Sequence, residues 1–249
     1  MVKSYPTKLT IVLLATVANA ALTDIHEMYK EISNATGSTG SGTNDLGPLR
    51  SFSPGGGMWG WVGQAVMDMI GEGYGCWCYF QDDVGKGKSD PVDELDSICK
   101  ALHQGYECAM IDNPTCVPYE VEYNRPNVFW MANKDQILPA CENLNSGNEC
   151  HINACASETN FVFQIFNAAN PNSDDNQHKS DGTGFDVEAN CPITHGETGE
   201  KSCCGVYPDR FPYKSFDGIR ACCGKGTYDT GIQECCEEGG EQVVRLVCN

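Results

Sequence analysis

His103 and Glu158 are the two side chains whose types and positions could carry acid–base chemistry. His103 lies in the segment SDPVDELDSICKALHQGYECAM, and Glu158 lies in ECHINACASETNFVFQIF. A carboxylate against an apolar face is costly unless it is paired, and a neutral imidazole N–H is a suitable partner. The carboxylate then fixes the tautomer and directs the second ring nitrogen outward. We predict that the two residues pair; a partly solvated Glu158 is the alternative.

Two helices must position this pair. In the first, Asp90 is a candidate cap and Pro91 suits the first helical position. The apolar residues of that segment advance by three and four, which places His103 about 70° from the centre of their stripe, between core and surface. The stripe consists of Val92, Leu95, Cys99, Leu102, Tyr106 and Ala109. The second helix begins near Glu149, and Ile152, Cys155, Val162 and Phe166 form its apolar side.

The first twenty residues have the pattern of a secretory signal peptide. Lys3 and Lys8 precede an apolar run that ends at Ala18-Asn19-Ala20; a buried N-terminal helix is the alternative. Residues 21–57 form a flexible tract with a glycosylation acceptor at Asn34. Sixteen cysteines favour a secreted, extracellular, disulfide-rich protein. The net charge of −18 disfavours a nucleic-acid partner.

The cysteines fall into two sets of eight on either side of a polar linker, residues 169–188. This even division predicts two modules, 58–168 and 189–249, each closing its own bridges. From Met58 onward, apolar residues at helical spacing form either core or the lining of an apolar ligand slot. The fold class predicted is mainly α and disulfide-rich, with a helical module followed by a small β-rich, cysteine-rich module.

The tail repeats a rhythm of vicinal cysteines, at Cys203-Cys204, Cys222-Cys223 and Cys235-Cys236. Glycines and short apolar runs between these pairs predict strands and turns. In a secreted chain such cysteines favour disulfides over zinc. The stretch ACCGKGTYDTGIQECC is similar to the dicysteine repeat of galaxin, an extracellular matrix protein, which implies matrix components as possible partners.

Two motifs follow one another within residues 58–166. The first is Gly75-Cys76-Trp77-Cys78 followed by PVDELD, Cys99 and His103, and the second is Cys150-(x4)-Cys155-Ala156-Ser157-Glu158. The first resembles YGCYCG…PxDxxDxCCxxHDxCY of the secreted phospholipase A2 superfamily. The second resembles that family's C(x4)CxCD, with Ser157 in place of a cysteine.

The resemblance implies a hydrolase in which His103 activates a water that attacks a phospholipid ester. Glu158 would orient His103, and Tyr106 would supply a neighbouring hydroxyl. It also implies a Ca²⁺ site at Trp77, Tyr79 and Gln104, and a phospholipid or membrane surface as partner. The family pattern implies the disulfides Cys78–Cys99, Cys116–Cys150 and Cys141–Cys155, and leaves Cys76 with Cys108.

Three departures bear on activity. Gln104 replaces the aspartate that binds Ca²⁺ in the family, and a neutral amide holds a hard cation far less well. The loop between Cys78 and Pro91 is longer than the family's calcium loop, and one of two adjacent cysteines before the histidine is missing. We therefore carry three functions forward: a phospholipase A2-type esterase, a non-catalytic extracellular matrix or mineral-associated protein, and a lipid-binding protein.

Overall fold

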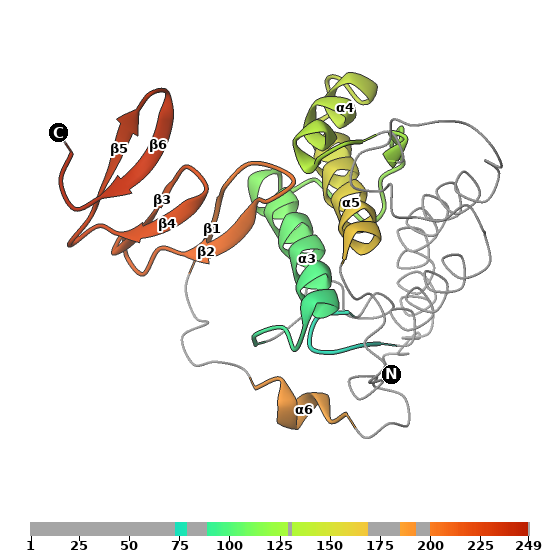
Figure 1. Ribbon diagram of the computed structural model, residues 1–249, viewed down its shortest axis with the longest axis horizontal. Helices are drawn as coiled ribbons and strands as arrows, with labels where there is room; N and C mark the ends of the chain where they lie inside the picture. Colours follow the sequence, from blue (N-terminus) through green and yellow to red (C-terminus); the bar gives the residue numbers. More distant parts are fainter. Residues whose placement is uncertain (1–72, 79–88, 129–130, 169–184, 193–199, 249) are drawn as a thin grey trace, which may run out of the picture.

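The computed structural model describes residues 73–78, 89–128, 131–168, 185–192 and 200–248. Two long helices, α3 (Glu94–Asp112) and α5 (Glu149–Asn167), lie side by side (Figure 1). Between them come the short helices η3 (Lys134–Gln136) and α4 (Ile137–Leu144), and after α5 the single turn α6 (Val187–Asn190). Six strands follow: β1 (Lys201–Cys204), β2 (Phe211–Lys214), β3 (Arg220–Cys223), β4 (Gly226–Asp229), β5 (Glu234–Glu238) and β6 (Glu241–Arg245).

Helix α3 begins three residues later than the sequence pattern suggested. Asp93, and not Asp90, is the N-cap, because its Oδ1 accepts the amide of Asp96 at 2.9 Å. Pro91 therefore lies before the helix. Asn148 caps α5 in the same way, by accepting the amide of His151. Each cap satisfies an amide that the helix itself leaves without a partner.

The apolar core lies between α3 and α5. It consists mainly of Leu95, Ile98, Leu102, Tyr106, Phe161, Val162 and Ile165, all buried. The helices approach closely at Gly105, where an added Cβ would lie 2.4 Å from Ser157 Oγ. Three disulfides that the family pattern implied are present: Cys78–Cys99, Cys116–Cys150 and Cys141–Cys155.

The six strands form three two-stranded antiparallel hairpins, β1–β2, β3–β4 and β5–β6 (Figure 1). Disulfides join them in series, because each vicinal cysteine pair connects one cysteine backward and the next cysteine forward. The bonds are Cys108–Cys203, Cys204–Cys222, Cys223–Cys235 and Cys236–Cys248. All sixteen cysteines are therefore oxidised, and crosslinks supply what these small hairpins lack in apolar core.

The prediction of a mainly α fold is wrong. About 38% of the residues that the structure describes are helical and about 20% lie in strands, so the helices there are few and hairpins form a substantial part. Among the described residues, the apolar residues of α3 and α5 follow a helical period, whereas residues 113–128 form mostly turns and irregular backbone.

The predicted Cys76–Cys108 bond is also wrong. Cys76 bonds Cys191, and Cys108 bonds Cys203. Two disulfides therefore join the first set of eight cysteines to the second set, so the two modules do not close their bridges separately. Parity could not reveal this, because two bonds between the sets leave each count even.

Several predicted features lie outside the described residues. They are the signal peptide 1–20, the tract 21–57 with Asn34, the apolar segment that begins at Met58, Tyr79, and most of the linker 169–188. Within the described ranges, no helix combines the length and apolar character needed to cross a bilayer.

Candidate functional site

His103 lies on α3 and is 1% exposed. Burial lowers the pKa of its imidazole to about 4, and a hydrogen bond from the ring to the backbone of Trp77 opposes this shift only in part. The ring is therefore neutral at pH 7. A neutral imidazole can accept a proton, which is the property that a general base needs.

Glu158 projects from α5 into the same helix interface and is 1% exposed. Its Oε1 accepts a hydrogen bond from the hydroxyl of Tyr106 at 2.6 Å, and its Oε2 accepts one from Tyr123 at 2.5 Å. Charge-assisted bonds of this kind offset the cost of burying a carboxylate.

The structure brings three predicted residues together. Tyr106 lies three residues after His103, which places both within one turn of α3, and it reaches across to Glu158. A direct contact between His103 and Glu158 stays a prediction. Sequence reasoning missed Tyr123, because it lies in an irregular segment whose pattern gives no direction for its side chain.

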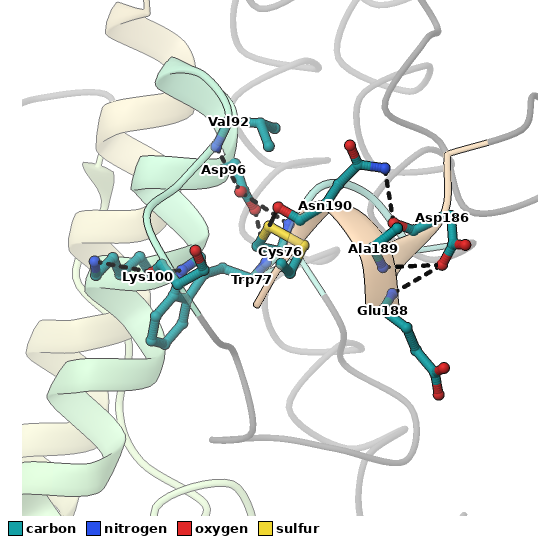
Figure 2. The surroundings of a disulfide bond; sticks show 11 residues. Cys76, Trp77, Val92, Asp96, Lys100, Asp186, Glu188, Ala189 and Asn190 are labelled. Atoms are coloured by element: carbon teal, nitrogen blue, oxygen red, sulfur yellow. Dashed lines mark hydrogen bonds between the residues drawn. A yellow bond between two sulfur atoms is a disulfide. The ribbon is translucent and has the colours of Figure 1, made fainter. Parts of the chain in front are cut away.

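A tight turn, Tyr74–Cys78, places Trp77 against His103, with 6.2 Å between the ring centroids. Asp96 fixes this turn: its carboxylate accepts the amides of Cys76 at 2.9 Å, Trp77 at 2.7 Å and Val92 at 2.9 Å (Figure 2). Burial raises the pKa of the Asp96 carboxyl, while these three amides oppose the rise.

Gly75 makes this arrangement possible. Its φ is +59°, and an added Cβ would lie 2.4 Å from Asp96 Cγ. The backbone turn and the carboxylate therefore fit together only with glycine at this position. The motif Gly75-Cys76-Trp77-Cys78 was singled out in the sequence, but nothing in it indicated Asp96 as the group that organises the turn.

The predicted Ca²⁺ site receives little support from its described residues. Gln104 is half-buried on α3 and offers a neutral amide, while the backbone of Trp77 bonds His103. Ca²⁺ takes six to eight oxygen ligands, with carboxylates among them. These two donors do not fit such an ion, and the third predicted ligand, Tyr79, is outside the described residues.

In the described part of the chain, Glu234, Cys236 and Cys248 place one ligand atom each within 4.8 Å of one another. Cys236 and Cys248 form a disulfide, so they offer no thiolate to a metal.

No protein-family model matches the chain, and no curated protein or solved structure is similar enough to count as a match.

Proposed function

We propose that this protein is a secreted carboxylic ester hydrolase of the phospholipase A2 type. The observation that supports the proposal is the buried, neutral imidazole of His103 one helical turn from Tyr106, which holds the carboxylate of Glu158. Titratable groups whose pKa is shifted by burial gather at functional sites, and acid–base chemistry is the function that an imidazole and a carboxylate in one interface would serve.

In the proposed reaction, His103 accepts a proton from water. The water oxygen bonds to the acyl carbon of the ester. The acyl C–O bond then breaks, and His103 returns the proton to the leaving alkoxide, so that a fatty acid and a lysophospholipid form. A pKa of about 4 makes His103 a weak base. In this proposal the predicted contact of Glu158 with His103 forms on substrate binding, and the carboxylate then stabilises the imidazolium as it forms.

No step of this reaction is assigned to Ca²⁺, because Gln104 and the Trp77 backbone do not fit that ion. Secretion is part of the proposal. It is supported by eight disulfides, which persist in oxidising compartments, and by the signal-like first twenty residues.

The test is hydrolysis of micellar diheptanoyl phosphatidylcholine by the full mature chain, with His103→Gln as the variant. His151→Gln is the matched control, because His151 is a half-buried histidine on α5 outside the proposed site. We expect His103→Gln to lower kcat by about 10²-fold or more and His151→Gln to leave it unchanged. Absence of turnover in the wild-type chain, or turnover that survives His103→Gln in a folded protein, would remove the proposal.

A second candidate, a non-catalytic extracellular matrix or mineral-associated protein, is favoured by the hairpin series. Its last hairpin exposes four carboxylates, those of Glu234, Glu237, Glu238 and Glu241. Saturable binding of the wild-type chain to calcium carbonate particles, with no ester hydrolysis, would favour this candidate over the first.

A further inference from the structure

Lys100, which is half-buried, and Asp90, which is exposed, form a charge pair near His103. Lys100 lies on α3, three residues before His103, and its Nζ is 4.0 Å from Asp90 Oδ1. The same ammonium lies 5.0 Å from the centroid of the Trp77 ring and 3.4 Å from the carbonyl oxygen of Ser89 (Figure 2). Trp77 Nε1 donates to that carbonyl too, at 3.1 Å. Lys100 and His103 therefore contact the same indole.

The Lys100–Asp90 pair contributes little to stability. The side chain of Lys100 is 25% exposed and that of Asp90 is 100% exposed, and such pairs gain little in water. The indole and the carbonyl hold the ammonium in place independently of Asp90. Both charges thus remain able to bind a ligand.

Two neighbouring acids, Asp93 and Asp96, have other partners. Asp96 accepts three backbone amides. Asp93 accepts the hydroxyl of Tyr74 and the amide of Asp96. In the part of the chain that the structure describes, Asp90 is the carboxylate that pairs with Lys100.

We propose that Lys100 and Asp90 recognise a zwitterionic phosphate–ammonium headgroup, with the phosphate on Lys100 and the ammonium on Asp90. A headgroup of this kind carries opposite charges a few bonds apart, which matches two opposite charges at 4.0 Å. A headgroup with net negative charge fits less well, because Asp90 and a protein of net charge −18 repel it. Lys100 and His103 lie three residues apart on α3 and both lie near the Trp77 ring, so a headgroup on Lys100 would be bound close to the proposed base. The inference that zwitterionic phospholipids are the substrate class rests on the proposed function, whereas the inference that the pair binds such a headgroup does not.

The test is a ligand-observed NMR titration of the full mature chain with three probes: phosphocholine, choline and inorganic phosphate. We expect Lys100→Gln to weaken phosphocholine binding about ten-fold, the size of one charge-assisted contact. Asp90→Asn should weaken choline and phosphocholine but strengthen inorganic phosphate, because it removes a repelling charge. The control is Lys134→Gln, which removes a lysine that is 50% exposed and pairs with Asp209 at 2.6 Å.

Equal weakening by Lys100→Gln and Lys134→Gln would show a general charge effect and overturn the proposal. So would Asp90→Asn affecting all three probes alike, or no binding of phosphocholine by the wild-type chain. Hydrolysis is a separate arm, measured on diheptanoyl phosphatidylcholine and diheptanoyl phosphatidylglycerol. Headgroup binding without hydrolysis would remove the proposed function and leave this inference standing. Hydrolysis that depends on His103 but is unchanged by Lys100→Gln and Asp90→Asn would support the proposed function and show that the pair does not select the substrate.

Discussion

The hydroxyl of Tyr207 donates a hydrogen bond to the backbone carbonyl of Gly105, 3.2 Å away, and so joins the first hairpin to the helix that carries His103. Arg210 adds two bonds to Asp112, at 2.7 and 2.9 Å, and Cys108–Cys203 adds a covalent link. The first hairpin is therefore packed onto α3, and the tail is not a module held only by a linker.

Removing the Tyr207 hydroxyl should weaken this interface. Tyr207 is 8% exposed, and burial raises the pKa of its phenol. We expect Tyr207→Phe to lower the free energy of unfolding by about 1 kcal/mol, because the Gly105 carbonyl keeps its helical partner while one buried bond is lost. Urea unfolding measures this. Tyr213→Phe on β2, where the side chain is half-buried, serves as control and should change stability by less than about 0.5 kcal/mol. Equal effects of the two changes would contradict the role of Tyr207.

Gly105→Ala should separate the two long helices. The new Cβ would lie 2.4 Å from Ser157 Oγ, whose position is fixed by a 2.8 Å hydrogen bond to Asn153 O. We expect a loss of about 1–3 kcal/mol in thermal or urea unfolding, as overpacked cores show.

Ser157→Gly should restore part of that loss, because it removes the atoms that the new methyl group meets. Gly226→Ala is the control, since nothing lies within 4 Å of its added Cβ. A Gly105→Ala chain as stable as the wild type would show that the helices can move apart without cost.

The two long helices could be predicted from the sequence because their apolar residues follow a period that burial imposes. Tyr106 and Glu158 were identified for the same reason, since each lies at a fixed angle on a helix. The N-cap was predicted at Asp90 instead of Asp93, because Asp90-Pro91 has an equally good local sequence pattern for a helix start. Local patterns cannot reveal contacts between segments distant in sequence. The Cys76–Cys191 bond, spanning 115 residues, and the approach of Tyr123 to Glu158 are both of this kind.

Loss of different disulfides in the series should affect the stability of α3 to different extents. Replacing Cys236 and Cys248 by serine removes a crosslink that closes only 12 residues at the end of the tail. We expect the α3–α5 unit and the proposed ester hydrolysis to be unchanged. Replacing Cys108 and Cys203 removes the link between α3 and β1, which spans 95 residues, and should cost about 2–5 kcal/mol. Hydrogen exchange of the α3 amides distinguishes the two variants. Only replacement of Cys108 and Cys203 should raise the exchange rate of these amides. Equal exchange rates in both variants would contradict the serial arrangement.

The pH dependence of stability should report the burial of His103. Its pKa is about 4 in the folded chain and about 6.5 when unfolded, so between these values the unfolded state binds more protons. Stability therefore rises with pH across this window, and acidification from pH 7 to below 4 should remove about 3 kcal/mol through this residue. Protonation of paired carboxylates also destabilises the protein in acid, so the measurement is the difference in unfolding free energy between wild type and variant. We expect the gap in unfolding free energy between wild type and His103→Gln to narrow by about 3 kcal/mol as the pH falls. A constant gap for His103→Gln would mean that the imidazole titrates like an exposed one, and the argument for a neutral base would fail with it.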